Sequence, residues 1–415
     1  MGEPHLALRP AVPDTAERTA HIFTFDGYLR FWAEDRPGRV ALDTADAVIT
    51  FAELDRMTVA IAAGLADLGI ATGDRIAWQG HDAGQFFALL FAAARSGVVM
   101  VPIAPDHPPD MARAIAEDAG AKAVFLGPAH GGHGHVFAGL CGLVRCFDAD
   151  AARRWIAGLD SGSFPLSAPN AAVLQIYEER GRDDPRGVVL SHCNLLALRK
   201  AVLGHTLPHV VPGDDETMLV AMPCWRIGGI GPVVMALAAG LPVAIRDVAE
   251  PCALIAALAG HKPTRMYIAP DALARLLTHP EATHIARGQV RYVACGPRPV
   301  PTGLRRAVRA RLGATLIRSY GLPETAGTIA MLAPEDRAGA SAVGRPLPGV
   351  EIRVIGADGA ALPPGTAGTV QIRSASVMLG YWNQPQATAA ALTQDGWVVT
   401  GDRGHLDSGG ILHLI

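Results

Sequence analysis

The sequence has little charge imbalance, no closely spaced cysteine pair and no uninterrupted apolar run long enough to suggest a membrane protein. Its formal net charge is -3 over 415 residues, with acidic and basic residues interspersed. A balanced surface offers no basic face for nucleic acid, so small molecules or proteins are the expected partners. None of the six cysteines forms a C-x-x-C pair, which argues against a zinc or redox motif and favours free thiols in a reducing compartment.

Signals for export and membrane insertion are also missing. The first twenty residues lack the short apolar core and the cleavage site of a signal peptide, which predicts a cytoplasmic protein. Two apolar runs, 83–104 and 227–245, are interrupted by charged, glycine or proline residues. We therefore expect each run to form a buried helix followed by a buried strand, and we expect no membrane span.

The order of the apolar segments predicts an α/β fold. Several segments, among them QFFALLFAAARSGVVMVPIA and ALIAALAGHKPTRMYIAP, run from a helix through a glycine-containing turn into a β-branched strand. This rhythm is typical of parallel sheets covered by helices. From about Gly344 the pattern changes to short alternating strands with Gly, Pro and Asp turns. We predict two helix-covered, mostly parallel sheets in αβαβα layers plus a small β-rich, barrel-like lobe, with lobes at 1–170, 171–340 and 341–415.

A glycine-rich stretch, GPAHGGHGHVFAG, contains three histidines: His130, His133 and His135. Such a group could be imagined as a metal site. Because the histidines lie among flexible glycines and no other ligand is fixed nearby, an exposed loop is the favoured interpretation.

The stretch QIYEERGRDDPRGVVLSHCN (175–194) has the position of a phosphate-binding loop. It lies between the strand-like AAVLQIY and an amphipathic segment that could start a helix with Ser191 near its N-cap. Phosphate loops use small residues, hydroxyls and a lysine, so that backbone N–H groups converge on the anion. Here charged residues fill the loop, so a solvated, self-paired surface loop is the competing interpretation.

This loop and later segments together resemble the motifs of one family. The later segments include SYGLPETAG (319–327) and GWVVTGDRGHLDSGG (396–410), and similarity extends in family order over 36–55, 69–77, 343–355 and 377–388. The family is the adenylate-forming superfamily of acyl-CoA synthetases, luciferases and peptide-synthetase adenylation domains. The resemblance covers nearly the whole chain and implies nucleotide and acid binding where the lobes meet.

The family's phosphate loop reads Y-T-S-G-T-T-G-x-P-K-G-V followed by a Ser-His pair, and this chain matches its flanks. The matching positions are Tyr177, Pro185, Gly187, Val188, Ser191 and His192. The donor positions differ: the Ser, Gly, two Thr, Gly and Lys are replaced, in order, by Glu179, Arg180, Gly181, Arg182, Asp183 and Arg186. We expect Arg186 to substitute for the lysine, and acids in the loop to repel a triphosphate.

The resemblance also assigns roles to individual residues. It implies that Tyr320 packs on adenine, that Glu324 helps to hold magnesium, and that Asp402 binds the ribose hydroxyls, with Gly321 and Gly187 as further nucleotide contacts. Structural interpretations stay open beside these roles. Tyr320 could be a core aromatic, Glu324 an acid at a helix start, and Asp402 a turn residue.

Two more segments depart from the family pattern. MPCWRIGGIGP resembles the acyl-pocket segment P-L-F-H-x-G-G, with Trp225, Arg226 and Gly228 at the predicted pocket and Arg226 in place of the histidine. RYVACGPRPVP stands where a turn of small residues lines the adenine pocket, but Pro297 and Arg298 replace those residues. Backbone approach to adenine should be hindered there.

The implied function is an AMP-forming acid–thiol ligase. ATP, with Mg²⁺, would activate an aliphatic, aryl or longer acyl carboxylic acid as an acyl-adenylate, and CoA or a carrier thiol would accept the acyl group. The altered loop predicts weak activity. The family's small C-terminal domain, with its lysine, has no counterpart before Ile415. A natural end, a truncated reading frame and an artificial boundary at Ile415 all stay open, and so does the supply of that domain by a separate polypeptide. The alternative is a non-catalytic relative that binds an acyl or adenylate-like ligand or a protein partner.

Overall fold

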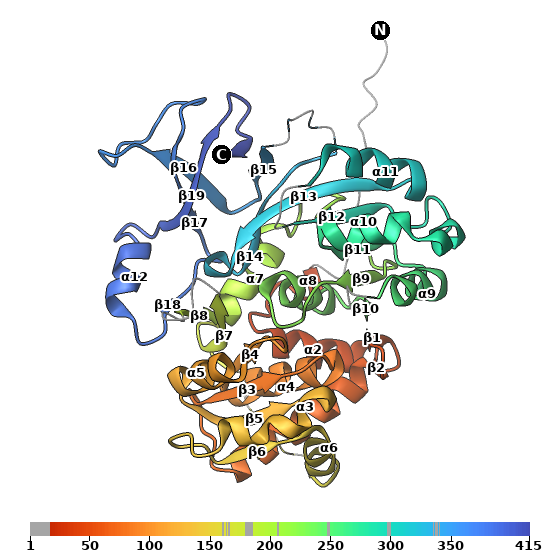
Figure 1. Cartoon of the computed structure of the whole chain (residues 1–415), viewed down its shortest axis with the longest axis vertical. Coiled ribbons are helices and arrows are strands. Elements are labelled where there is room, and N and C mark those ends of the chain that lie inside the picture. Colours follow the sequence, from red (N-terminus) through yellow and green to blue (C-terminus); the bar gives the residue numbers. More distant parts are fainter. Residues whose placement is uncertain are drawn as a thin grey trace.

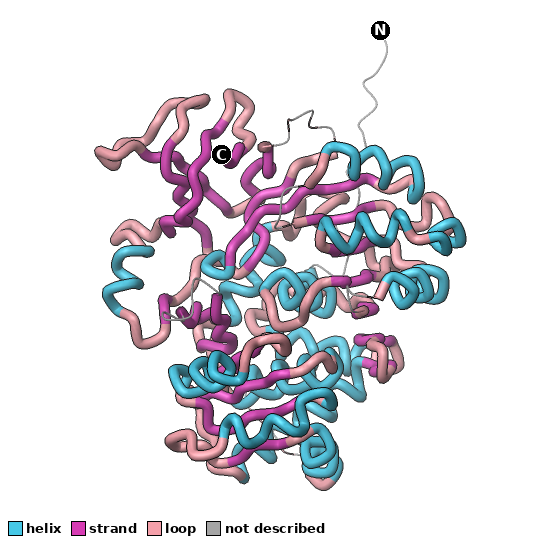
Figure 2. The backbone as a smooth tube through the Cα atoms, in the orientation of Figure 1, coloured by secondary structure: helices cyan, strands magenta, loops and turns pink. Residues whose placement is uncertain are grey.

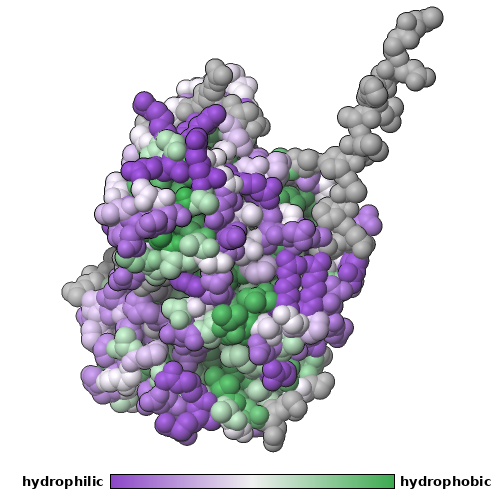
Figure 3. Space-filling model, turned by 90° about the vertical axis from the view of Figure 1, so that its right-hand side faces the viewer, coloured by the Kyte–Doolittle hydropathy of each residue, from purple (hydrophilic) through white to green (hydrophobic). Residues whose placement is uncertain are grey.

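The protein is described here by a computed structural model. The described residues are 17–159, 162, 164, 167–178, 186–205, 207–246, 250–296, 300–334, 336, 339 and 341–415. Within these ranges, none of the helices combines the length and the hydropathy needed to cross a bilayer. On the face shown in Figure 3, hydrophilic residues predominate and apolar patches lie between them.

The first sheet contains seven strands in the order β18-β8-β7-β4-β3-β5-β6 within the described ranges. The central strands are parallel, whereas β8 pairs antiparallel with both β7 and β18. The strands are β3 (Arg75–Gln79), β4 (Val99–Ile103), β5 (Ala121–Leu126), β6 (Arg145–Phe147), β7 (Ala172–Glu178), β8 (Arg186–Ser191) and β18 (Gly380–Tyr381). The associated helices are α2 (Phe25–Asp35), α3 (Phe51–Asp67), α4 (Ala83–Ser96), α5 (Pro109–Ala119), the 3-10 helix η1 (Pro128–Phe137) and α6 (Ala149–Ala157).

The second sheet contains thirteen strands of the described chain, in the order β16-β17-β19-β20-β15-β14-β13-β12-β11-β9-β10-β1-β2. Its α/β part comprises β1 (Val40–Asp43), β2 (Val48–Thr50), β9 (Met218–Ala221), β10 (Val243–Ile245), β11 (Arg265–Ile268), β12 (Tyr292–Cys295) and β13 (Thr315–Leu322). Its helices are α7 (His192–Ala201), α8 (Ile227–Ala238), α9 (Pro251–His261), α10 (Pro270–Thr278), η2 (Pro280–His284) and α11 (Thr302–Leu312). From β1 to β13, neighbouring strands run parallel.

The β-rich segment continues this second sheet through antiparallel pairs. Its elements are η3 (Pro323–Thr325), β14 (Gly327–Met331), β15 (Ala342–Pro346), β16 (Val350–Ile355), β17 (Gly368–Ser374), α12 (Pro385–Ala391), β19 (Val398–Leu406) and β20 (Leu412–Leu414). In Figure 1 the β16, β17 and β19 strands lie at the upper left, joined to the α/β part through β13, β14 and β15. Because β1 joins the second sheet and β18 joins the first, chain segments cross between sheets, and the boundaries at 170 and 340 remain a prediction.

Successive side chains along a strand point to opposite faces of each sheet and enter different apolar cores. On β3, Ile76 and Trp78 belong to the apolar cluster shared with α2, α4 and α8, whereas Ala77 belongs to the cluster with α5. On β9, Met218 faces the shared cluster and Leu219 faces the cluster with α9 and α10. This period of two places helices on both faces of both sheets. Figure 2 shows the resulting alternation of helical and strand layers, which confirms the predicted α/β fold class.

The two apolar runs form helix and strand as predicted. The run 83–104 contains α4 and β4, and the run 227–245 contains α8 and β10. The Asp82 side chain caps α4 by accepting a hydrogen bond from the Gln85 N–H at 3.0 Å. The helix ends at Gly97, whose φ of 72° lies in the left-handed region that glycine occupies readily.

The histidine-rich stretch is not the exposed loop that its composition predicts. It forms η1, and His130 is buried with its Nε2 atom 2.8 Å from the carbonyl oxygen of Pro105. The His130 ring also lies 5.1 Å from the ring of His133. The prediction was wrong for His130 because its hydrogen-bond partner comes from a different segment, which glycine content does not reveal.

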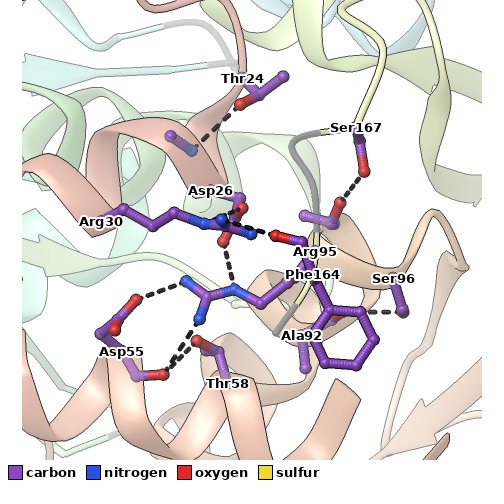
Figure 4. Close-up of polar contacts among 12 residues, drawn as sticks. Thr24, Asp26, Arg30, Asp55, Thr58, Ala92, Arg95, Ser96, Phe164 and Ser167 are labelled. Carbon is purple, nitrogen blue, oxygen red and sulfur yellow. Dashed lines mark hydrogen bonds and ion pairs between the residues drawn. The ribbon is translucent and has the colours of Figure 1, made fainter. Parts of the chain in front are cut away.

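A buried ion-pair network joins three helices of the shared core. Arg95 on α4 donates from Nε to Asp26 on α2 at 2.7 Å and from Nη2 to Asp55 on α3 at 2.5 Å. Arg30 contacts the other oxygen of Asp26 at 2.9 Å. Burial raises the pKa of Asp26, and the two arginines oppose that rise. Figure 4 shows the Arg95 side chain pointing between the two carboxylates, so one guanidinium ties α2, α3 and α4 together.

Removal of Arg95 should therefore destabilise the protein strongly. In Arg95→Met, Asp26 loses its principal partner inside the core, and we expect a loss of about 3–5 kcal/mol in the free energy of unfolding, measured by urea denaturation. Arg153→Met is the control, because the Arg153–Asp150 pair is exposed and such pairs contribute about 0–1 kcal/mol. Equal effects of the two substitutions would contradict a structural role for the network.

His192 should make stability depend on pH. Burial lowers the pKa of His192 to about 4, and its ring lies 4.7 Å from that of Phe25. Between the unfolded pKa of about 6.5 and the folded pKa, the unfolded chain binds a proton that the folded chain excludes, so stability falls as pH falls. We expect His192→Gln to reduce the stability difference between pH 7.5 and 4.5 by about 2–3 kcal/mol. The exposed His284→Gln is the control, and an unchanged slope in His192→Gln would refute the prediction.

Candidate active site

A cavity of about 510 Å³ lies where α7, α8 and the β13–β14 turn meet. Its walls include Trp225, Arg226 and Gly228, the three residues predicted for the acyl pocket, and also Gly321. Most other lining side chains are apolar, among them Leu195, Leu198, Val202, Met218, Met222 and Met235. A mostly apolar pocket of this size can enclose a drug-sized ligand.

The predicted acyl-pocket segment turns sharply before α8. Arg226 is the N-cap residue of α8 and has an extended backbone, with φ -115° and ψ 151°. Gly229 packs so closely against the Pro223 carbonyl that a side chain there would overlap it, and a Cβ at Gly228 would come 3.1 Å from the terminal methyl of Met222. Glycines at the start of α8 therefore let the preceding turn fold back onto the helix beside the cavity.

The segment 319–327 forms another wall of the cavity. Gly321 on β13 packs directly against the Gly327 carbonyl, leaving no space for a side chain. Thr325 fixes the turn, because its Oγ1 accepts from the Leu322 N–H at 3.1 Å and donates to the Leu322 carbonyl at 3.0 Å. Ser319, Gly321, Leu322, Pro323, Thr325, Ala326 and Gly327 line the cavity.

Tyr320 and Asp402 are in direct contact. The Tyr320 hydroxyl donates to Asp402 Oδ2 at 2.5 Å, which joins β13 to β19. Burial, together with the hydrogen bond and charge of Asp402, raises the pKa of Tyr320, so the phenol keeps its proton. The Tyr320 ring belongs to an apolar cluster with Ile329 and Val370. The structure thus shows the packing of a core aromatic and a fixed orientation of the Asp402 carboxylate.

Glu324 and Arg186 are brought together through Tyr381. Glu324 is 3% exposed, and its Oε1 accepts a hydrogen bond from the Tyr381 hydroxyl at 2.7 Å. The Arg186 guanidinium carbon lies 5.7 Å from the centre of the Tyr381 ring. Antiparallel pairing of Tyr381 with Val188 holds β18 beside β8, the strand that begins at Arg186. The Glu324 charge also contributes to the raised pKa of Tyr320, after burial and Asp402.

Tyr381 was not among the residues predicted for the site. It lies in VMLGYWNQPQAT, a stretch that resembles the family, but nothing in that stretch points to Glu324 as its partner. The hydrogen bond joins residues 57 positions apart in the chain. The resemblance of the stretch was the available signal, and the contact itself required the fold.

Gly187 lies beside a second polar cluster. A Cβ at Gly187 would come 2.8 Å from Gln175 Nε2 and 3.0 Å from the Tyr177 ring. The Tyr177 hydroxyl donates to Asp118 Oδ2 at 2.5 Å and accepts from Gln175 Nε2 at 2.7 Å. The Gly187 carbonyl accepts from the Trp382 N–H at 2.8 Å. These contacts fix the strand that leaves the predicted phosphate loop.

Some predicted positions lie outside the described residues. They are the loop residues 179–185 and the adenine-side residues Pro297 and Arg298. The site as described therefore consists of the cavity, the segment 319–327 beside it, the Tyr320–Asp402 pair and the Arg186–Tyr381–Glu324 group. Of the predicted residues, Trp225, Arg226, Gly228 and Gly321 line the cavity; Tyr320, Glu324, Asp402, Arg186 and Gly187 are not among its lining residues.

Sequence comparison identifies ligases among the relatives. A fatty acid–[acyl-carrier-protein] ligase, ScoC of Streptomyces coeruleorubidus, is 28% identical over 390 residues, covering 92% of this chain and 75% of that protein. A feruloyl-CoA synthase of Amycolatopsis sp is 29% identical over 385 residues, covering 91% of this chain and 75% of that protein. The chain thus spans about three quarters of the length of these relatives.

Structural comparison and a family match agree on the fold. The N-terminal domain of FACL13 from Mycobacterium tuberculosis superposes with a TM-score of 0.86 at 23% identity, covering 94% of this chain and 99% of that one. The O-succinylbenzoate coenzyme A synthetase of Bacillus subtilis in complex with AMP gives 0.82 at 24% identity, covering 93% and 77%. The family described as AMP-binding enzyme matches residues 29–173 and 184–382, which is most of the chain. The chain therefore belongs to the AMP-binding enzyme family.

Proposed function

We propose that this protein is an AMP-forming acid–thiol ligase. A carboxylate oxygen of the acid attacks the α-phosphorus of ATP, pyrophosphate leaves, and an acyl-adenylate forms. The sulfur of CoA or of a carrier thiol then attacks the acyl carbon, and AMP leaves. The first step depends chiefly on positioning and on stabilising the charge of the transferred group. Membership of the AMP-binding family and the ligase activities named for the relatives support this proposal.

One structural observation carries the proposal. The segment 319–327 lines the cavity through Gly321, Pro323 and Ala326, while the same segment holds Tyr320 and Glu324 in polar contacts outside the cavity lining. A ligand with an acyl part and an adenosine part needs two adjoining environments, one apolar and one polar. A single turn of chain borders both.

The polar residues suit the nucleotide. Asp402 accepts one hydrogen bond from Tyr320, which orients its carboxylate, and a carboxylate can accept two ribose hydroxyls. The buried carboxylate of Glu324 fits magnesium, because this ion prefers hard oxygen ligands. Magnesium would supply charge neutralisation at the phosphates. Tyr381 orients Glu324, and Arg186 brings a permanent positive charge to the start of β8 beside them.

The cavity would receive the acyl chain. Trp225, Arg226 and Gly228 line it, as expected for the residues that resemble the family's acyl-pocket segment. Apolar walls favour an aliphatic or aryl acid through burial of its carbon atoms. An acid bound in this cavity would lie beside Gly321, at the turn that also carries Glu324.

We further propose that adenylation is slow compared with that of the relatives. The sequence places Glu179 and Asp183 at loop positions where the resembling family has small or hydroxyl donors. Those acids repel a triphosphate, whereas AMP carries less charge. The same observation favours the alternative function, a non-catalytic relative that keeps the fold to bind an acyl or adenylate-like ligand.

Nucleotide binding should depend on Asp402. We expect isothermal titration calorimetry to give dissociation constants between micromolar and sub-millimolar for AMP and for magnesium-ATP, with Asp402→Ala weakening both at least tenfold through loss of the ribose contacts. The control is Asp67→Ala, at the exposed end of α3. Absence of binding at several millimolar nucleotide would contradict the ligase proposal, and acyl ligands would then be titrated alone.

Substitution of Glu324 should weaken the binding of nucleotide with magnesium and spare the binding of nucleotide without it. Glu324→Gln keeps the shape of the side chain and an oxygen for the Tyr381 hydroxyl but removes the negative charge. We expect AMP affinity without metal to stay within about twofold, and magnesium-ATP affinity to fall about tenfold or more, since one charge-assisted ligand is lost. Equal losses for both nucleotides would show that Glu324 maintains the fold of the turn and does not serve the metal.

A further inference from the structure

Arg199 lies on the face of α7 that borders the cavity. Asn194, Leu195, Leu198 and Arg199 all line the cavity, and Val202 continues the same face one turn later. These spacings of three to four residues place the side chains on one side of the helix. Arg199 is therefore a cationic residue on an otherwise mostly apolar wall.

The Arg199 side chain is buried, and its polar contacts within the described residues are with hydroxyl groups. It is 5% exposed, its Nη2 lies 3.5 Å from Thr19 Oγ1, it makes a polar contact with the Tyr28 hydroxyl, and its Nε has no hydrogen-bond partner among the described residues. Its guanidinium carbon lies 5.9 Å from the centre of the Tyr28 ring. Burial lowers the pKa of Arg199, opposed by the Tyr28 phenol and, less, by the charge of Asp214. A buried cation in this state is costly unless an anion completes it.

Other buried arginines of this protein have carboxylate partners. Arg95 contacts Asp26 at 2.7 Å, and Arg265 contacts Glu216. The ion pairs found among the described residues do not include Arg199. Arg95, Arg199 and Arg265 are all buried away from water. Arg199 differs from the other two because no carboxylate partner is found for it among the described residues.

The charge of the cavity wall has one sign. Arg199 and Arg226 line it, and no aspartate or glutamate is found among its described lining residues. Apolar side chains such as Leu198, Val210 and Met218 line the same cavity. Low-dielectric walls strengthen the attraction of such a cation for an anion.

We propose that the acid bound in this cavity is a dicarboxylic acid with an apolar middle, whose second carboxylate pairs with Arg199. This inference rests on the proposed function and names its substrate class. One carboxylate oxygen bonds to the α-phosphorus as pyrophosphate leaves, beside the segment 319–327. The other carboxylate stays ionised and is held by the planar guanidinium, which matches a carboxylate with two parallel hydrogen bonds.

The test compares a diacid with its matched dimethyl ester, which has no free carboxylate, in the absence of nucleotide. Calorimetric dissociation constants are measured on the purified chain for the α,ω-diacids of six, eight and ten carbons and for their dimethyl esters. At least one diacid should bind tenfold or more tightly than its ester. In Arg199→Met that ratio should fall to within about twofold, while Lys200→Met should keep it. Lys200 is adjacent in sequence, but its Nζ donates to the Ala20 carbonyl and it is not among the cavity-lining residues.

Two results would overturn the inference: no diacid binds more tightly than its ester, or the preference persists in Arg199→Met. Among the described residues, removing Arg199 leaves no carboxylate without an ion-pair partner, so Arg199→Met should fold, as circular dichroism can check. If it does not fold, Arg199→Lys is the deciding variant. Lysine keeps the positive charge but cannot form the two parallel hydrogen bonds of a guanidinium, so we expect a reduced preference for the diacid. An undiminished preference in Arg199→Lys would contradict the pairing.

The nucleotide titration distinguishes failure of this inference from failure of the proposed function. Magnesium-ATP binding without a diacid preference overturns the substrate class and leaves the ligase proposal standing. A diacid preference lost in Arg199→Met, without any nucleotide binding, supports the anion site and contradicts the ligase proposal.

Discussion

The close approach of β13 and β14 at Gly321 is the constraint on which the candidate site depends. Gly321 packs against the Gly327 carbonyl so tightly that no side chain fits between the strands. This contact sets the course of the turn that carries Glu324, and β13 also carries Tyr320 to Asp402 on β19. Since β13 is parallel to β12 and antiparallel to β14, the same strand joins the α/β part of the sheet to the β-rich part. The cavity and the polar pairs consequently meet at one turn.

Two buried arginines show how this protein uses charge in different ways. Arg95 lies between Asp26 and Asp55 and ties three helices of the shared core. Arg199 has a comparable degree of burial, but its contacts among the described residues are with Thr19 and Tyr28, and no ion pair with a carboxylate is found there. A paired cation fixes structure, whereas a cation without a carboxylate on a cavity wall is suited to a ligand's anion. The fold and the proposed specificity thus follow from the same electrostatic rule.

The sequence predicts the architecture better than the contacts within the site. Helix–turn–strand periodicity predicted α4 with β4 and α8 with β10, because local hydrophobic spacing determines which face is buried. The resemblance placed Trp225 and Arg226 at the cavity. It did not reveal Tyr381 as the partner of Glu324, since that hydrogen bond depends on β18 crossing to the first sheet. Helical periodicity likewise cannot distinguish an arginine that faces a cavity from one that faces water, so Arg199 was missed.

The most direct test is a crystal structure of the chain bound to a non-hydrolysable acyl-adenylate analogue. We expect the ribose at Asp402, the adenine beside Tyr320 and the acyl group in the cavity lined by Trp225 and Arg226. An analogue bound elsewhere, or bound with its acyl group outside that cavity, would contradict the claim that one turn of chain joins the two halves of the site.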